Sequence, residues 1–258
     1  MTAHVLTGLP ARWRTDRMLC AEREHWDGVR WTGDDDALLL VVSSHRRPGV
    51  SLLGRGDGAL VDRLVAELVA TRLTDARWMS LPRTARPSRA VLDALGLVPF
   101  STWDWLSADA APPVLDGEAR VRRLEPVRES DAIRACLAAA NPQTSADPTA
   151  PGEVGWWGVD GRTELAGVVG VSVRAGISEG VSWHLHGLAV RDEYRGAGLG
   201  TALTAACTRA GLTRGAEWVS LGMYASNDPA RRIYHRLGYR TEAEFASFSP
   251  PDADRPPA

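Results

Sequence analysis

A strand, a glycine-rich loop and a helix follow one another between residues 185 and 209, and together they could bind an anion. The apolar run 185–190 predicts a strand, a polar turn covers residues 191–194, and Arg195-Gly196-Ala197-Gly198-Leu199-Gly200 opens a helical run over 201–209. Glycine lets the backbone approach a ligand closely, and the first amides of a helix converge where the helix dipole favours negative charge. The stretch therefore predicts a phosphate-binding loop.

Two common phosphate loops do not match this pattern. A nucleoside triphosphate loop needs a Lys-Ser or Lys-Thr pair after its glycines, and none follows here. A dinucleotide fingerprint needs glycines at its first, third and sixth positions, which this loop does not provide. The loop therefore favours a different phosphate-bearing ligand.

Two histidines on the strand before the loop could remove a proton. His184 and His186 are two residues apart, so strand alternation places both side chains on one face. A neutral imidazole, with an ordinary pKa of about 6.5, accepts a proton near pH 7 either directly or through water. A structural role is the alternative for each histidine. We expect at least one to act as a base, and His186, nearer the expected reacting group, is favoured.

A second run, Asn227-Asp228-Pro229-Ala230-Arg231-Arg232-Ile233-Tyr234-His235-Arg236-Leu237-Gly238-Tyr239, places Tyr234 on a predicted helix. A phenol with an ordinary pKa of about 10 stays protonated at neutral pH, whereas a thiol has a pKa near 8.5. Tyr234 could therefore protonate a departing thiolate, with a core aromatic as the alternative. Asn227 either caps the helix or hydrogen-bonds a ligand.

These two runs resemble the GCN5-related N-acetyltransferases. Arg-x-x-Gly-x-Gly at 195–200 resembles motif A of that family, and 227–239 resembles motif B, Asn-x-x-Ala-x-x-x-Tyr-x-x-x-Gly followed by an aromatic residue. The resemblance covers about residues 119–249. It implies a mixed, mostly antiparallel sheet with flanking helices, whose splayed central strands admit the acyl-pantetheine arm of acetyl-CoA, the acyl donor. Segment 184–190 resembles that of arylalkylamine N-acetyltransferases, in which two histidines on this strand serve proton removal.

The resemblance also implies a set of site residues. The catalytic candidates are Tyr234, His186 and His184, and no metal site is expected. The expected acetyl-CoA contacts are Leu188, Ala189, Val190, Arg195, Gly196, Ala197, Gly198, Leu199, Gly200, Thr201 and Asn227. Among these, backbone amides around 188–190 could stabilise an oxyanion. Trp156 and Trp157 alternate in direction, and one of them could line the acceptor pocket, with core packing as the alternative.

The elements expected around these residues alternate between strands and helices. One or two helices are expected within residues 1–35. Further helices are expected at 62–73, 88–95, 129–140, 201–209 and 229–237. Strands are expected at 37–43, 78–81, 101–106, 121–124, 154–159, 164–173, 185–190, 218–224 and 239–248. The fold class is therefore α/β (α+β).

The chain also aligns with itself at a shift of 140 residues. Arg55-Gly56-Asp57-Gly58 meets 195–198, and Trp78-Met79-Ser80-Leu81 meets 218–221. We therefore predict two tandem units of the same kind. Asp57 would place negative charge where a phosphate should sit, so the first copy is expected to be degenerate. The predicted domains are 1–110 and the catalytic 119–249, joined by a linker at 111–118 and followed by a disordered tail at 250–258.

Composition restricts the class of protein. The 258 residues include 44% hydrophobic and 24% charged residues with a net charge of −2, so nucleic acid is not expected as a partner. Three widely spaced cysteines predict free thiols, and the absence of a leader or a long apolar run predicts a cytoplasmic protein without membrane contact. The oligomeric state stays open.

These observations favour an acyl-CoA-dependent N-acyltransferase. We expect direct transfer of an acetyl group to a primary amine of a small molecule or peptide, since no cysteine falls in either signature to hold the acyl group. A non-catalytic acyl-CoA-binding or sensing protein is the alternative. An O-acyltransferase or hydrolase built from the same parts is a third.

Overall fold

The chain divides into two compact units in the computed structural model, which describes residues 5–26, 29–44, 47–71, 75–177 and 179–253. The first unit contains the chain up to Asp104, Tyr224–Ser226 and the residues from Glu242 onward. The second unit contains Trp105–Met223 and Asn227–Thr241. Strands β5, β10 and β11 therefore contribute residues to both units.

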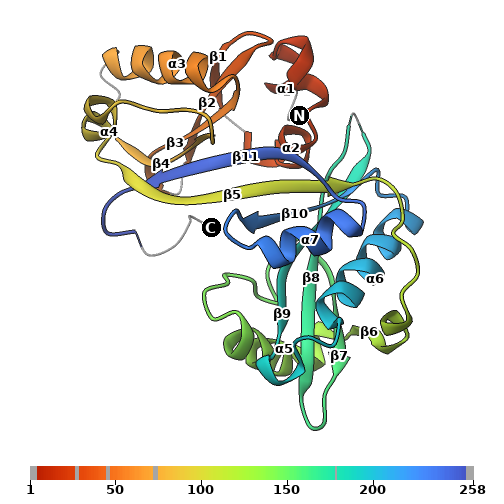
Figure 1. The fold of residues 1–258 in the computed structure, drawn as a ribbon. Helices are drawn as coiled ribbons and strands as arrows, with labels where there is room; N and C mark the ends of the chain where they lie inside the picture. The colour runs from red at the N-terminus through yellow and green to blue at the C-terminus, as the bar shows by residue number, and fades with distance from the viewer. Residues whose placement is uncertain (1–4, 27–28, 45–46, 72–74, 178, 254–258) are drawn as a thin grey trace. The chain divides into compact units, whose positions relative to one another are not determined.

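The first unit is a mixed sheet covered by helices (Figure 1). Its strands include the order β1-β2-β3-β4-β11, in which β3 and β4 are parallel and the other pairs are antiparallel. In chain order the elements are α1 (Val5–Gly8), η1 (Ala11–Thr15), α2 (Arg17–Ala21), η2 (Arg23–Trp26), β1 (Arg30–Gly33), β2 (Ala37–Ser44), β3 (Arg47–Gly56), α3 (Gly58–Ala70), β4 (Ala76–Pro82), α4 (Arg89–Leu95) and β5 (Val98–Ala108).

The second unit has the same kind of sheet. Its order is β10-β9-β8-β7-β6, with β9 and β10 parallel and the other pairs antiparallel. The elements are η3 (Asp116–Arg120), β6 (Val121–Leu124), α5 (Pro126–Ala140), β7 (Glu153–Asp160), β8 (Leu165–Ala175), β9 (Val181–Val190), η4 (Asp192–Tyr194), α6 (Leu199–Thr213), β10 (Val219–Tyr224), α7 (Asp228–Arg236) and β11 (Arg240–Ser249).

Helices cover both faces of the second sheet (Figure 1). On one face, α5 packs through Ile133 and Leu137 onto a cluster that contains Trp156. On the other face, α6 and α7 pack onto a cluster that contains Trp157 and Leu203. Both tryptophans are buried, and their opposite directions follow from the alternation of side chains along β7. This layering confirms the expected mixed sheet with flanking helices.

Strand β9 departs from regular pairing on both sides, close to its carboxyl end. Its parallel register with β10 covers only 183–185, opposite 219–221. On the β8 side, Gly187 and Leu188 together face the single residue Val169, which is a β-bulge. Gly187 has φ +58°, a left-handed conformation that glycine adopts without strain. The central strands therefore part after Leu185, as expected for a sheet that admits a ligand between them.

The two units repeat one order of elements. The series β1-β2-β3-α3-β4-α4-β5 in the first corresponds to β7-β8-β9-α6-β10-α7-β11 in the second, and each has one parallel pair at the same place. The 140-residue shift carries α4 onto residues 229–235, within α7. This agreement supports the duplication, which stays a proposal. The predicted domain limits also stay a prediction. Strand β11, which lies in the predicted second domain, pairs with β4 of the first.

Most expected elements form, with a few differences. Strand β3 was not expected, because glycines and polar residues interrupt its apolar pattern. Ser88 caps α4 by accepting from the Val91 amide, and Gly96 ends it at φ +65°, as predicted. The predicted linker 111–118 runs into η3. In the predicted tail, Pro250 accepts a turn hydrogen bond from Ala253, and residues 254–258 lie outside the described residues.

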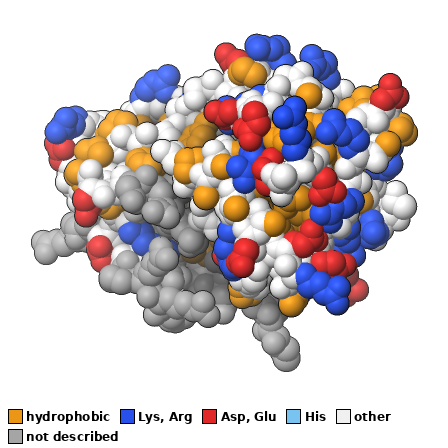
Figure 2. Space-filling view, turned by 90° about the horizontal axis from the view of Figure 1, so that it is seen from below, with side chains coloured by type: hydrophobic (Ala, Val, Ile, Leu, Met, Phe, Trp, Pro, Cys, Tyr) orange, Lys and Arg blue, Asp and Glu red, His pale blue; other side chains and the backbone are white. Residues whose placement is uncertain are grey.

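The surface and the thiols bear on the expected class of protein. Figure 2 shows acidic and arginine side chains interspersed over one face, as the small net charge suggests. Cys20, Cys136 and Cys207 are buried free thiols. Within the described ranges, no group of histidine, cysteine and acidic side chains could hold a metal ion. A search of the same ranges finds no helix long and apolar enough to cross a membrane.

Gly211 sets how closely α6 approaches the sheet, and we predict that Gly211→Ala destabilises the fold. An added Cβ would lie 2.9 Å from both Trp183 Cε3 and Val219 Cγ2. Overpacking of this kind costs about 1–3 kcal/mol, which outweighs the roughly 1 kcal/mol that alanine gains in a helix. Thermal unfolding should show a lower Tm. Gly222→Ala is the control, because a Cβ there meets nothing within 4 Å; equal Tm values for the two variants would refute the prediction.

Candidate active site

The start of α6 has the geometry of an anion-binding site. Gly196 and Gly198 have φ of +77° and +75°, and Gly198 is the N-cap. An added Cβ at either glycine would meet nothing within 4 Å. The first turn of α6 carries no acidic residue, and across the described residues no side chain accepts from the amides of 199–201. The positive end of the helix dipole and the unpaired N–H groups at the start of α6 could therefore bind an anion.

The corresponding loop of the first unit is closed by its own side chain. Asp57 is the N-cap of α3, and its carboxylate accepts a hydrogen bond of 2.9 Å from the Leu60 amide. A carboxylate therefore occupies the position that a phosphate would need, and it repels further negative charge. Arg55, which the repeat aligns with Arg195, is buried in an ion pair with Asp16. Both features support a first copy that no longer binds the cofactor.

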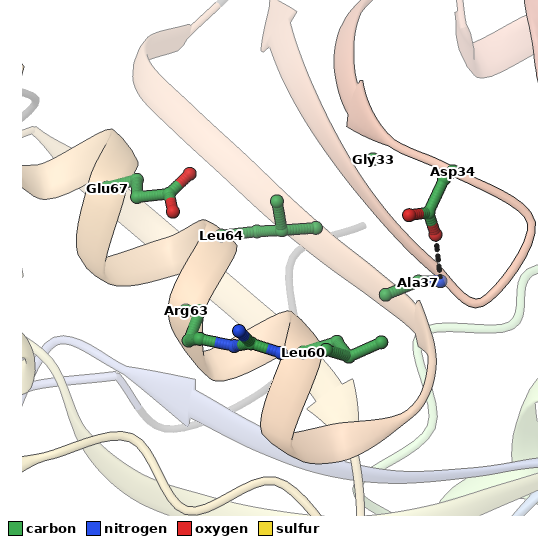
Figure 3. A pocket seen from close by; sticks show the side chains of 7 residues that line it. All are labelled: Gly33, Asp34, Ala37, Leu60, Arg63, Leu64 and Glu67. Carbon is green, nitrogen blue, oxygen red and sulfur yellow. Dashed lines mark hydrogen bonds between the residues drawn. The ribbon is translucent and has the colours of Figure 1, made fainter.

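A pocket in the first unit lies beside α3 and differs from a phosphate site (Figure 3). Helix α3 contributes Arg63 and Glu67, and the turn between β1 and β2 contributes Asp34, whose carboxylate accepts from the Ala37 amide at 3.1 Å. The other lining residues are Gly33, Leu60 and Leu64. Two carboxylates beside one guanidinium do not favour a diphosphate.

Arg195 and Tyr194 hold the glycine loop in place. The Arg195 guanidinium donates to the Val190 carbonyl at 3.1 Å and lies 2.9 Å from the Asp192 carboxylate, with its side chain 57% exposed. The Tyr194 hydroxyl donates to the Glu164 carboxylate at 2.9 Å. The loop is thus anchored by side chains, while contact between Arg195 and a phosphate stays a prediction.

Tyr234 is buried on α7, where it packs beside Tyr239 with ring centroids 5.9 Å apart. Burial raises the pKa of Tyr234 to about 12, so the hydroxyl remains protonated throughout the neutral range. Its cluster includes Leu188 and Val190 at the end of β9. In the part of the chain that the structure describes, no group hydrogen-bonds this hydroxyl, and its role as an acid stays a prediction. Asn227 caps α7 by accepting from the Ala230 amide at 3.2 Å, as one of its two predicted roles requires.

His184 is held by a serine on the neighbouring strand. Its Nδ1 lies 3.0 Å from Ser220 Oγ, and that hydroxyl donates to the Trp183 carbonyl at 3.2 Å. When that hydroxyl gives its single proton to the carbonyl, a neutral His184 donates from Nδ1 to Ser220 Oγ. Its Nε2 is then the nitrogen that can accept a proton.

His186 lies on the same face of β9 and meets a carboxylate. Its Nε2 is 2.9 Å from Glu153 Oε1, an ion-pair distance that lacks the alignment of a hydrogen bond. The ring packs edge-on against Trp156, with centroids 5.5 Å apart. It also covers Gly170, where an added Cβ would lie 2.4 Å from His186 Cε1. The ring is therefore fixed with Nε2 toward Glu153.

The sequence analysis did not find Glu153, Ser172 and Ser220. Glu153 closes a polar loop and the serines sit inside apolar strands, so none belongs to a recognisable motif. Only the pairing of strands brings them together. The structure places Glu153 opposite Ser172, Ser172 opposite His184, and His184 opposite Ser220. Strand alternation could have indicated their shared face only once this register was known.

Comparison with known proteins bears on the family and the fold. Residues 124–239 match the model of the acetyltransferase (GNAT) family. None of the curated proteins matches the chain. The chain's fold is similar to that of a GCN5-related N-acetyltransferase from Kribbella flavida, at 22% identity over 93% of this chain and 96% of the other, with a TM-score of 0.56.

Two further solved structures show the same likeness of fold. A GCN5-related N-acetyltransferase from Sphaerobacter thermophilus has 15% identity over 95% of this chain and 93% of its own, with a TM-score of 0.52. An acetyltransferase from the GNAT family of Colwellia psychrerythraea has 11% identity over 81% and 80%, with a TM-score of 0.54. At these identities, the similarity concerns the fold alone.

The contrast between the two loops predicts the effect of Ala197→Asp. The repeat aligns Ala197 with Asp57, and Ala197 lies one residue before the N-cap Gly198, so the new carboxylate adds negative charge at the start of α6 and should repel a diphosphate. We expect affinity for coenzyme A to fall at least about 30-fold, since close like charges cost several kcal/mol. Isothermal titration calorimetry measures the Kd and the expected stoichiometry of one per chain.

Ala197→Asn is the matched control, because an asparagine has the size and the side-chain oxygen of an aspartate but adds no charge. It should lose clearly less affinity than Ala197→Asp. Wild-type affinity in the aspartate variant would contradict an anion site at the start of α6, and two molecules bound per chain would contradict the degenerate first copy.

Proposed function

We propose that this chain, whose residues 124–239 belong to the acetyltransferase (GNAT) superfamily, transfers an acetyl group from acetyl-CoA to a primary amine of a small molecule or peptide. The observation that carries this proposal is the α6 start, whose amides no described side chain caps, next to a strand that parts from its neighbour. The helix start suits the diphosphate of coenzyme A, and the parted strands suit its acyl-pantetheine arm.

The reaction needs a base, an oxyanion site and an acid. A histidine of β9 takes the proton of the amine, whose nitrogen then attacks the thioester carbonyl carbon. Backbone amides at 188–190, beyond the register with β10, stabilise the negative charge that develops on the carbonyl oxygen. The carbon–sulfur bond breaks, and Tyr234 donates its proton to the departing sulfur. The remaining extra proton on the nitrogen replaces the one that Tyr234 gave, and the histidine releases its proton to solvent. An ammonium and acetyl-CoA thus yield the amide, free coenzyme A and one proton.

The geometry favours His184 as the base. With its proton fixed on Nδ1 by Ser220, the neutral ring accepts at Nε2. Nε2 of His186 already lies against the Glu153 carboxylate at 2.9 Å, so it is less open to an incoming amine. His186, which the sequence favours, stays a candidate, and the two differ in what their loss should do.

Tyr234→Phe should lower kcat about 100-fold, the lower end of what a general acid contributes. Affinity for coenzyme A should not change, because the hydroxyl contacts only the departing sulfur. Release of free thiol, measured with acetyl-CoA and a panel of primary amines, gives kcat. Tyr239→Phe is the matched control: it also removes a buried phenol hydroxyl, which bonds Thr208 at 2.7 Å. If both variants keep wild-type kcat, Tyr234 is not the acid.

pH–rate profiles test the base. A base works only when it is deprotonated, so kcat/KM of the wild type should fall as pH decreases through the imidazole titration. His184→Ala should remove this acid limb and slow the reaction about 100-fold. His186→Ala should slow it less and keep the limb. If both variants keep the fall of kcat/KM at low pH unchanged, neither histidine is the base.

A non-catalytic acyl-CoA-binding protein is the second candidate, since the same helix start would serve it. The polar side chains on β9 and α7 favour the enzyme. A wild-type protein that binds coenzyme A but releases no thiol with any amine would decide for the binding protein.

A further inference from the structure

A row of polar side chains crosses the α5 face of the second sheet. Glu153 on β7, Ser172 on β8, His184 on β9 and Ser220 on β10 stand opposite one another in register, and His186 joins the row through Glu153. The neighbouring positions on this face carry apolar residues such as Trp156. Polar groups inside an apolar sheet cost free energy unless they are hydrogen-bonded, so this row requires an explanation.

Three buried atoms of the row have no hydrogen-bond partner among the described residues: Nε2 of His186, Oε2 of Glu153 and Oγ of Ser172. Nε2 of His186 has an ion-pair contact with Glu153 Oε1, which leaves the Glu153 and Ser172 oxygens. The Ser172 residue is only 7% exposed, and the Glu153 side chain only 12%. Buried polar atoms without partners are rare in folded proteins and mark a catalytic or ligand-binding role or a bound water. Both atoms accept hydrogen bonds, which suits a ligand with several donors.

We propose that Glu153 and Ser172 bind the acceptor as a cation, through an ammonium group that the two unpartnered oxygens receive. An ammonium has three donors and a positive charge, which Glu153 Oε2 and Ser172 Oγ complement. Nε2 of His186 contacts the other carboxylate oxygen of Glu153, Oε1, and this contact restricts the orientation of the carboxylate. This inference rests on the proposed function, and it narrows the acceptors to amines that are charged in solution.

The row also connects the binding point with the proposed base. Ser172 stands opposite His184 in the register, so an ammonium held at Glu153 and Ser172 lies next to the histidine that removes its proton. Losing the proton leaves a neutral nucleophile and weakens its attraction to Glu153. Glu153 is therefore a binding and positioning residue, and it takes no proton from the amine itself.

The test compares a cationic acceptor with a neutral one. Acetyl transfer to 2-phenylethylamine, a cation at pH 7, and to aniline, which is neutral there, is followed by thiol release and product mass. Glu153→Gln keeps the shape and removes the charge. It should raise KM for 2-phenylethylamine at least about 30-fold, as expected for losing one partner of a buried charge pair, and leave KM for acetyl-CoA and the rate with aniline unchanged.

Two further variants support the test. Ser172→Ala should also raise KM for 2-phenylethylamine, by about 5- to 10-fold, as the loss of one hydrogen bond predicts, and it keeps the proposal testable if Glu153→Gln does not fold. Asp160→Asn is the control, because Asp160 is an exposed carboxylate on the same strand that pairs with Arg122. It should behave as the wild type.

The outcomes separate this inference from the proposed function. If the wild type acetylates 2-phenylethylamine and neither Glu153→Gln nor Ser172→Ala raises its KM, the cation site is wrong and the enzyme stands. If the wild type binds coenzyme A and acetylates no amine, the proposed function is wrong and this inference with it. A KM increase confined to the cationic acceptor supports both.

Discussion

The amides at the start of α6 are the constraint around which the second unit is organised. The first turn of any helix has N–H groups without partners inside the helix, and a protein must satisfy them with a side chain, water or a ligand. Here Gly196 and Gly198 keep that end clear, because left-handed glycines turn the chain and add no side chain. The sheet contributes the second condition, since β9 and β10 part just before the loop. A diphosphate and an extended arm fit these two conditions together.

The first unit shows what the same elements do without that constraint. Its loop follows a strand, enters a helix and leads to a parallel strand, as in the second unit. Asp57 caps its helix, and Arg55 is buried in an ion pair with Asp16. Groups that would meet a ligand in one unit thus stabilise the fold in the other. The first unit keeps the fold, but its own side chain binds the N–H groups at the start of α3. This is consistent with a copy that has a structural role.

The polar row on the α5 face has a different physical basis. Its members come from four strands, and each one alone would be a modest defect in an apolar sheet. Together they place a carboxylate, two hydroxyls and two imidazoles along one line. Such groups interact strongly inside a protein because the local dielectric is low. Tyr234 lies in the cluster on the opposite face, so β9 carries the proposed base on one side and packs toward the proposed acid on the other.

The sequence alone determined those features that depend on near neighbours. Glycine spacing at 195–200, the cap at Ser88 and the stop at Gly96 act within a few residues, so the loop and most helices were predictable. Strand β3 was not predicted, and α3 begins at Gly58, before the predicted residue 62. Glycines interrupt the local pattern at both places. The sequence also indicated that the first copy is degenerate, because Asp57 stands where the second unit has Ala197. This was predictable because a carboxylate at a helix start acts on the nearest amides.

Only the tertiary structure decided which distant residues share the site. Glu153 follows a polar loop, and its contact with His186 depends on the register of three strands, β7, β8 and β9. The same holds for Ser220 beside His184 and for the pairing of β11 with β4. Strand register is set by how whole faces pack into a core, and a shift of one residue would reverse every side chain. Local sequence therefore fixes the loop that we propose binds the donor, while packing fixes the side chains that we propose bind the acceptor.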